Sequence, residues 1–366
     1  MSEVNANPAP SPLGELLRLA GPTMAQMASY TVMQFLDAWM LARAVGTAAP
    51  AAASNAGGLA FSFLSFGIGT IMVVNTLASQ SYGQRNYSQC GRHLWQGVWF
   101  SLAYALAMLP LLWVVPGWFA AFGHEPDMVA MEGTYFRIMV WASVFKLVHS
   151  SFSQFMLATN RPNLVLLSSI LGVAVNAAFA YVVLFGKFGV TPMGVRGAAV
   201  AQALGMAVEM VTLICFATWR RSSRKQFGTL DFRFRRPEMR TLLRVGFGSG
   251  LQFIVEVLAW TMFANVVFGQ LGRVAMEANA FMFRYLVCTF LPALGISSAV
   301  TALVGRYIGM GRPDVAAQRA DLGFKVAAVY LLATGLVYFL FRRELIEVFT
   351  HEPEVVRLGA LLMIFA

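Results

Sequence analysis

Residues 163–185 read NLVLLSSILGVAVNAAFAYVVLF, a stretch without a charged side chain. An α-helix rises about 1.5 Å per residue, so a segment of this length crosses the hydrocarbon core of a bilayer, which is about 30 Å thick. The whole chain of 366 residues is 58% hydrophobic and 12% charged, whereas soluble domains carry about 45–50% apolar and 25% charged residues. A water-soluble fold is therefore excluded, and we predict an all-α polytopic membrane protein.

Similar apolar runs occur along the entire chain. The nine predicted spans are 20–42, 56–79, 94–118, 132–156, 163–185, 195–219, 247–269, 280–303 and 323–341. A last apolar stretch runs from Val355 to Ala366, and as a helix it reaches only about 18 Å, which is too short to cross. We therefore expect nine complete spans and the beginning of a tenth, with the sequence stopping inside a membrane helix.

Basic residues in short loops are retained on the cytoplasmic side of a membrane, so their distribution predicts the orientation. With the N-terminus inside, the inner loops hold 17 of the 27 Lys and Arg residues and the outer loops hold 8. Residues 1–19 lack the basic segment and short apolar core of a secretory signal peptide, and we predict a cytoplasmic tail there. We expect a multi-pass protein of the cell (inner) membrane with its N-terminus in the cytoplasm.

The formal net charge of +10 comes mainly from one segment, because nine basic residues lie between Arg220 and Arg244. Three phenylalanines are interleaved with them, a composition that also occurs in nucleic-acid-binding patches. Membrane spans flank this segment on both sides, which is typical of a cytoplasmic loop lying near anionic lipid headgroups. We predict that 220–241 is a basic linker, that membrane lipids are partners and that nucleic acid is not.

The sequence repeats itself on either side of this linker. The matches share one constant offset in residue number and join Leu16-Leu17-Arg18 to Leu242-Leu243-Arg244, Gln26 to Gln252, Gly69 to Gly295, and Gly83 to Gly309. Each complete repeat holds six spans, so the second copy begins on the same side of the membrane as the first. The two copies are therefore predicted to be parallel and related by a pseudo-twofold axis along the membrane normal. We predict an N-terminal six-helix lobe over 20–219 and an incomplete C-terminal lobe over 242–366. An intact chain of about 450 residues is expected to work as a monomer.

From about Gly14 to its last residue, the chain resembles the multidrug and toxic compound extrusion (MATE) family. The resemblance rests on LLRLAGPTMAQM at 16–27, ASQSYGQRN at 78–86 and NAAFAYVVLFGKFGVTPMGVRGAAVAQALG at 176–205. Each motif is degenerate, but their order, spacing and duplication together are specific. The resemblance implies a twelve-helix secondary transporter of two lobes, which exchanges Na⁺ or H⁺ for an organic, usually cationic, substrate.

Two carboxylates lie inside predicted spans, Asp37 in the first and Glu256 in the seventh. A charged side chain at membrane depth costs roughly 2.5–3.5 kcal/mol on insertion scales, so it tends to face a cavity or a partner. A buried carboxylate can bind Na⁺ or take up a proton. We predict that both residues couple ion and substrate, with Glu256 as the candidate for a bound Na⁺. The alternative for Asp37 is a solvated position or an ion pair with Arg43.

Further polar residues in the spans are weaker candidates. Asn176 matches a family asparagine that belongs to a polar network, but Ala180 stands where some members carry an aspartate, and Gln202 where some carry a threonine. Those departures put a proton network of the archaeal type in doubt. Asn176 has an interhelical hydrogen bond as its alternative role. Residues that line a cavity or merely bridge helices are Gln26, Gln252, Asn75, Asn279 and Gln202.

Other charged and helix-breaking residues are predicted to be structural. We expect Glu209 to have a structural role, and Arg137 and Lys146 to extend along the helix surface toward opposite interfaces. Helices are predicted to kink or break at Pro110, Pro116 and Pro292.

No enzyme chemistry is indicated by the sequence. The histidines form no HExxH pair, the three cysteines form no metal-binding pair, and no phosphate-binding GxxxxGK[ST] motif occurs. We therefore predict a transporter without a cofactor, using H⁺ or Na⁺ as coupling ion and small organic cations as substrates. The alternatives are a lipid-linked precursor flippase of the same superfamily and a passive channel or membrane scaffold.

Overall fold

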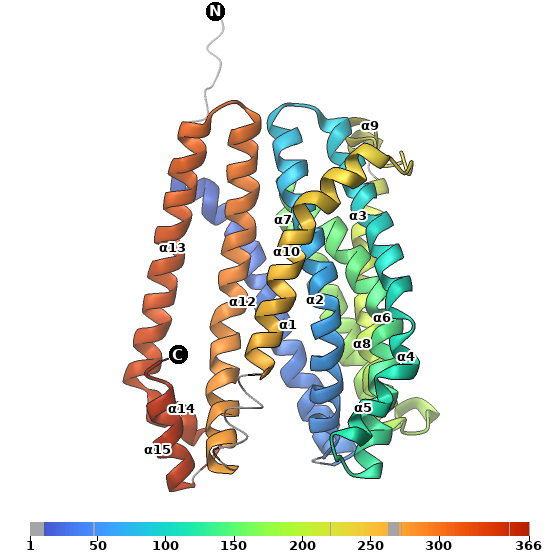
Figure 1. Cartoon of the computed structure of the whole chain (residues 1–366), viewed down its shortest axis with the longest axis vertical. Coiled ribbons are helices and arrows are strands. Elements are labelled where there is room, and N and C mark those ends of the chain that lie inside the picture. Colours follow the sequence, from blue (N-terminus) through green and yellow to red (C-terminus); the bar gives the residue numbers. More distant parts are fainter. Residues whose placement is uncertain are drawn as a thin grey trace, which may run out of the picture.

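The computed structural model describes residues 11–46, 48–219, 221–262, 271, 273–350 and 352–365. Every regular element within these ranges is a helix, and the long helices run along the long axis of the molecule (Figure 1). The elements are α1 (Pro12–Ala44), α2 (Ala48–Gly83), α3 (Tyr87–Met108), α4 (Leu111–Val114), α5 (Pro116–Ala121), α6 (Pro126–Ala158), α7 (Pro162–Phe185), the 3₁₀ turn η1 (Lys187–Gly189), α8 (Gly194–Trp219), α9 (Arg221–Phe227), α10 (Arg236–Met262), α12 (Arg273–Gly309), α13 (Pro313–Leu340), α14 (Arg342–Glu347) and α15 (Pro353–Leu362).

Seven segments of the described chain are helical, long and apolar enough to cross a membrane. They are Ala48–Gly83, Tyr87–Val114, Pro162–Phe185, Gly194–Trp219, Arg236–Trp260, Glu277–Gly309 and Pro313–Leu340. The first and fourth predicted spans fall in α1 and α6, two helices of 33 residues. Polar side chains such as Gln26, Gln34, Lys146 and His149 lower the mean hydropathy of these two helices.

Two predicted spans are only partly represented. The start of the predicted tenth span forms the short helix α15. Within the predicted seventh span, residues 263–269 lie outside the described residues, and α10 accounts for the rest.

Capping at Ser11 sets the start of α1. Its Oγ accepts a hydrogen bond of 3.1 Å from the N–H of Gly14, and Pro12 takes the first helical position, where a missing N–H costs nothing. The helix therefore begins well before the predicted span at 20–42, inside the segment predicted to be a cytoplasmic tail.

Prolines act differently in two of the long helices. The predicted span at 94–118 is interrupted at Pro110 and Pro116, which separate α3, α4 and α5. A proline in a helix removes one backbone hydrogen bond and clashes with the preceding turn, so these breaks confirm the expected effect. In contrast, α12 continues across Pro292 as one helix.

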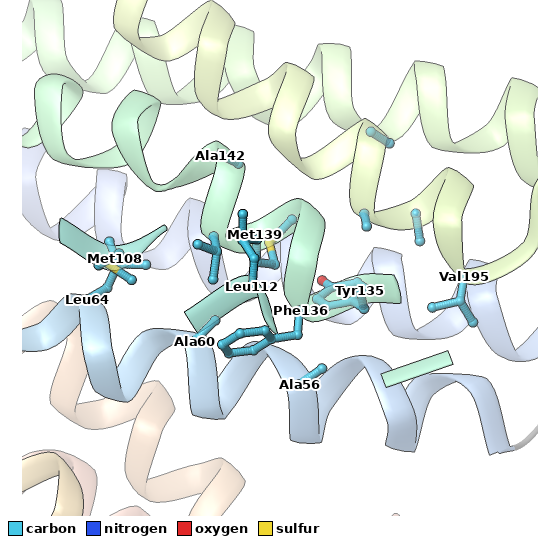
Figure 2. Close-up of a cluster of buried hydrophobic side chains, with 14 of the residues drawn as sticks. Ala56, Ala60, Leu64, Met108, Leu112, Tyr135, Phe136, Met139, Ala142 and Val195 are labelled. Atoms are coloured by element: carbon cyan, nitrogen blue, oxygen red, sulfur yellow. The ribbon is translucent and has the colours of Figure 1, made fainter. Parts of the chain in front are cut away.

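Helix α1 lies between a first group of helices, α2 to α8, and a second group, α12 to α15. It packs against α7 on one side and against α12 on the other, while α10 packs against α2, and Figure 1 shows α10 crossing in front of α2. In the core of the first group, Phe136 of α6 faces Ala56 and Ala60 of α2 (Figure 2). Small side chains at these positions let the two helices approach closely.

Repeated glycines make these crossings possible. A Cβ atom on Gly69 of α2 would lie 2.8 Å from the carbonyl oxygen of Ser249 in α10, and a Cβ atom on Gly295 of α12 would lie 3.0 Å from the carbonyl oxygen of Thr23 in α1. Both the glycines and the residues they contact are related by the constant offset between the repeats. The two repeats thus use equivalent glycines for equivalent crossings.

A second equivalent pair lies where α2 meets α12. A Cβ atom on Gly83 would collide with the carbonyl oxygen of Arg306, and a Cβ atom on Gly309 would collide with that of Gln80. These contacts also exchange under the offset between the repeats. Any larger residue at either glycine must therefore push the two helix ends apart.

The basic linker is docked onto the first group of helices. Trp95 and Trp99 of α3 donate through their Nε1 atoms to the carbonyl oxygens of Thr229 (3.0 Å) and Phe232 (2.9 Å). Phe227 is buried against α3 and α6. Helix α10 already begins at Arg236, so the last part of the predicted linker 220–241 is helical.

One ion pair stiffens the linker ahead of α10. Arg235 donates from Nη2 to Oδ2 of Asp231 at 2.8 Å. This hydrogen bond holds the pKa of the Asp231 carboxyl below its usual range. The Asp231 carboxylate therefore stays ionised across physiological pH, and its hydrogen-bond partner is Arg235 of the same linker.

Candidate functional site

Asp37 and Asn176 meet between α1 and α7. Asn176 Nδ2 donates a hydrogen bond of 2.8 Å to Asp37 Oδ1. Asn176 is completely buried, and its Oδ1 has no partner among the described residues, whereas Asp37 is half-buried. The pair joins a carboxylate, which can bind a proton or a cation, to an amide oxygen that remains available as an acceptor.

Tyr135 and Gln202 extend this polar region from α6 and α8. The Tyr135 hydroxyl donates to Gln202 Oε1, and Tyr135 lies within the electrostatic field of Asp37. Ala180 is completely buried one turn beyond Asn176 on α7. We call Asp37, Asn176, Tyr135 and Gln202 the Asp37 site. Three of these four residues are sequence-based candidates, and the fold brings them together from three separate helices.

A second buried polar cluster lies two helical turns from Asp37 along α1. Tyr30 donates to Glu209 Oε2 of α8 at 3.1 Å, and His149 Nδ1 of α6 lies 3.7 Å from the same oxygen. Lys146 Nζ lies 4.0 Å from the centre of the Tyr30 ring. We call Tyr30, Lys146, His149 and Glu209 the Glu209 cluster. Glu209 and His149 are each only 2% exposed.

The Glu209 cluster corrects one expectation and adds residues that sequence reasoning missed. Lys146 does not extend to an interface, because it is packed on Tyr30 inside the helix group. Glu209 is enclosed by α1, α6 and α7, where Gly172 leaves room for its side chain. The available signal was the pair Lys146 and His149, which lie three residues apart on one face of a membrane helix.

The two clusters share one face of α1. Gln26, Tyr30 and Asp37 follow each other at intervals of four and seven residues, which places them on one side of the helix. Gln26 is buried next to the Tyr30 hydroxyl. Any movement of α1 relative to α7 and α8 therefore disturbs both the Asp37 site and the Glu209 cluster.

The remaining sequence-based candidates lie apart from the Asp37 site. Asn75 of α2 donates from Nδ2 to the carbonyl oxygen of Ser298 in α12 at 3.0 Å, so it bridges two helices. Asn279 is buried in α12, Gln252 is exposed and Glu256 is half-buried in α10. Among the described residues, Glu256 forms no hydrogen bond or ion pair with another side chain. Its role in coupling, and a Na⁺ ion bound to it, stay predictions.

Metal-binding clusters and cavities do not single out another site. In the described part of the chain, no group of three or more His, Cys, Asp or Glu residues is placed to hold a metal ion. A cavity of about 410 Å³ lies between α2, α12 and α13. It is lined by Thr76, Gln80, Ala293, Ile296, Ser297, Val300, Thr301, Val304, Gly305, Ile308, Gly323, Phe324 and Ala327, none of which is a sequence-based candidate.

A charged network ties α1 to the second group of helices at the end where α1 begins. Glu15 accepts hydrogen bonds from the Tyr307 hydroxyl of α12 at 2.9 Å and from Arg319 Nε of α13 at 3.1 Å. Arg306 Nη1 lies 3.7 Å from the same carboxylate. All three partners of Glu15 come from α12 and α13, so this network holds the start of α1 to these two helices.

Comparison with known proteins identifies this arrangement. The sequence model of the MatE family matches residues 22–182 and 249–366. The chain belongs to the MatE family. The resemblance drawn from the sequence motifs is thereby confirmed, and the match covers both sides of the basic linker. Asp37, Asn176 and Glu256 all lie inside the matched ranges.

Relatives within the MatE family include bacterial proteins named "Probable multidrug resistance protein NorM". The one from Agrobacterium fabrum is 27% identical over 323 residues, which are 87% of this chain and 68% of that protein. The one from Mesorhizobium japonicum is 26% identical over 359 residues, covering 96% of this chain and 76% of that protein.

Solved MATE structures share the fold of this MatE protein. An outward-facing multidrug resistance MATE family transporter superimposes with a TM-score of 0.85 at 18% identity, covering 96% of this chain and 79% of that one. A MATE structure described as the straight conformation gives a TM-score of 0.84 at 19% identity, with the same coverage. At this level of identity the likeness establishes the MATE transporter fold.

Proposed function

We propose that this MatE protein is a multidrug exporter that releases organic, drug-like cations in exchange for H⁺ or Na⁺. The single observation that carries the proposal is Asp37, a carboxylate inside the first predicted span that is hydrogen-bonded at 2.8 Å to a fully buried asparagine. An ionised side chain at this depth is expensive, so it gains stability by binding a proton or a cation. The NorM relatives are named as multidrug resistance proteins, which supports the same assignment.

Exchange requires that binding of the ion weakens binding of the substrate, either because both use the same site or because their sites are linked. When Asp37 is ionised, it attracts a cationic substrate, and when it is protonated or carries Na⁺, that attraction is lost. A ligand shifts a conformational equilibrium only by its difference in affinity for the two states. The position of Asp37 on α1, the helix that contacts both helix groups, supports a link between ion binding and the relative position of the groups.

Alternating access is the movement that this proposal requires. The network of Glu15, Tyr307 and Arg319 holds α1 to α12 and α13 at the end predicted to be cytoplasmic. The crossing of Gly83 with Arg306 lies at the same end. Closure at this end agrees with an outward-facing state of the proposed cycle, and opening it to the cytoplasm requires these contacts to separate.

Asp37→Asn is expected to reduce gradient-driven efflux at least about tenfold, because coupling between two sites is typically worth about 1–3 kcal/mol. The measurement is the export of a fluorescent organic cation by cells that lack their own efflux pumps and express the protein. Imposed proton and sodium gradients are varied separately. The matched control is Asp321→Asn, which removes a carboxylate from an exposed pair with Lys325 on α13.

Two results would count against the proposal. If Asp37→Asn and Asp321→Asn exported the dye equally well, Asp37 would have no coupling role. If the unmodified protein only equilibrated the dye and never accumulated it against a gradient, a passive channel would be the correct description. Export that responds to one gradient alone identifies the coupling ion.

Glu15→Gln is expected to open the end held by the charged network. Hydrogen bonds to charged groups contribute about 1.5–3 kcal/mol, so the open state should gain about tenfold in population. In a variant with its native cysteines replaced by serine, Ser79→Cys reports opening, because Ser79 is completely buried against Gly305. The rate of its labelling by a membrane-impermeant maleimide in inside-out vesicles is the measurement.

The control for this experiment is Glu347→Gln, which disrupts the Arg343 pair within α14 and contacts no other helix group through that pair. Labelling should stay at the unmodified rate in the control. Equal labelling rates in the Glu15 and Glu347 variants would show that the network of Glu15 does not hold the end closed.

A further inference from the structure

A groove of about 530 Å³ lies on the outer side of α10, at the end of the helix nearest the linker. It is lined by Phe234, Arg236, Met239, Arg240, Leu243, Arg244 and Phe247. No residue of the groove belongs to the Asp37 site, the Glu209 cluster or the network of Glu15. The groove therefore has no part in the proposed transport chemistry.

The three arginines form one row on α10. Arg236, Arg240 and Arg244 are four residues apart, so they follow one another along one face over about 12 Å of helix. All three are exposed. The opposite face of α10 carries Leu242 and Gly246, which are buried against the neighbouring helices. The arginine row thus faces away from the protein.

Nearby carboxylates are committed to other groups. Asp231 is held by Arg235 and lies near Arg233. Glu238 is half-buried on the other side of α10, where its charge acts on His93 of α3. Among the described residues, no acidic side chain forms an ion pair with the three arginines of the groove. Their positive charge is left for an external anion.

Apolar side chains lie directly beside the arginines of the groove. Phe234, from the linker, and Phe247, one turn beyond Arg244, are 54% and 58% exposed, and Leu243 is 42% exposed between them. The segment Arg236–Trp260 is apolar enough to span a membrane. Arg236, Arg240 and Arg244 therefore lie in the first turns of a helix that is apolar enough to span a membrane, with exposed apolar side chains directly beside them.

We propose that this groove is a binding site for one anionic phospholipid, with the phosphodiester on Arg236, Arg240 and Arg244 and an acyl chain along Leu243 and Phe247. Arginine binds phosphate oxygens through a fixed pair of donors, which favours phosphate over other anions. A free phosphate ion would use only the arginines, whereas a lipid uses the apolar surface as well. The combination of both surfaces in one groove selects the lipid.

The test uses purified full-length protein in a zwitterionic detergent, titrated with dioleoylphosphatidylglycerol. Bound lipid is counted by native mass spectrometry, and the affinity is taken from the titration. The triple variant R236Q/R240Q/R244Q is expected to bind this lipid at least about tenfold more weakly, since each basic residue contributes to attraction at the membrane surface. The matched control is R85Q/R224Q/K225Q, which removes three exposed charges at the same end of the molecule, outside the groove.

Dioleoylphosphatidylcholine and glycerol phosphate are the comparison ligands. Phosphatidylcholine tests the need for a net negative charge, and glycerol phosphate tests the need for acyl chains. Both are expected to bind at least about tenfold more weakly than phosphatidylglycerol. The variant L243S/F247S should lose affinity for phosphatidylglycerol and leave the weak binding of glycerol phosphate unchanged.

Three outcomes would overturn the proposal. Equal losses in the two triple variants would show diffuse attraction of the basic surface instead of a site. Equal affinity for phosphatidylcholine would remove the role of the arginines, and equal affinity for glycerol phosphate would make this a phosphate site. Thermal midpoints measured without lipid verify that each variant is folded, so that a lost affinity is assigned to the groove.

Discussion

Glu209→Gln is expected to lower the free energy of unfolding by about 3 kcal/mol, because it leaves the Lys146 ammonium buried without its compensating carboxylate. Glutamine keeps an oxygen that can accept the hydrogen bond from Tyr30, so the change removes mainly the charge. Lys146→Met is also expected to lower the free energy of unfolding, since the buried Glu209 carboxyl then lacks a compensating cation and must give up its charge by taking up a proton. Unfolding in detergent, followed by tryptophan fluorescence or circular dichroism, measures both effects.

The double variant Lys146→Met, Glu209→Gln provides the decisive comparison. Each group lies in the electrostatic field of the other, and Tyr30 stands between them. Replacing both partners removes both buried charges, so most of the stability lost in either single variant should return. If the two single losses simply added in the double variant, Lys146 and Glu209 would not be a compensated pair. The exposed Arg343–Glu347 pair within α14 is the control and should show a much smaller effect.

Gly83→Val is expected to disrupt the crossing of α2 and α12 and to lower stability by about 3 kcal/mol or more. The first side-chain carbon at this position would collide with the carbonyl oxygen of Arg306. Backbone cannot rotate out of the way as a flexible side chain does, so the two helix ends have to separate. Gly309→Val should act in the same way against Gln80. The measurements are the yield of monodisperse protein and the thermal midpoint in detergent.

The control for both glycine variants is Gly58→Val. Gly58 lies in the same helix as Gly83, but a Cβ atom there has no neighbour within 4 Å. Valine at position 58 should therefore leave the protein close to its unmodified stability. Equal losses at positions 58 and 83 would mean that helix propensity, and not the helix crossing, explains the effect.

Much of the architecture was predictable because it depends on local properties of the chain. Apolar length predicted nine spans, and seven helices of the described chain are long and apolar enough to cross a membrane. The constant offset in residue number pairs Gly69 with Gly295 and Gly83 with Gly309 as equivalent positions. The contacts of these glycines were not predictable. The offset shows which positions of the two repeats are equivalent, but it contains no information on which helix packs against each position. The structure shows that each glycine admits the backbone of the opposite repeat.

The candidate site was predicted in part for the same reason. Asp37 stands out as a charge among apolar neighbours, and Asn176 stands out through the family motif. Their hydrogen bond joins residues 139 positions apart. Tyr135 went unnoticed because a tyrosine in a membrane helix is common, and only its position beside Asp37 and Gln202 makes it part of the site.

By itself, the sequence determined that this protein is helical and membrane-embedded, that it contains a repeat, and that it resembles the family to which it belongs. Those properties follow from hydrophobicity and order along the chain. Only the tertiary structure decided that Asp37 binds Asn176, that Lys146 stays inside with Glu209, and that the arginines of α10 face outward. The physical reason is that a helix determines which residues share a face, whereas the packing of all helices determines which faces meet.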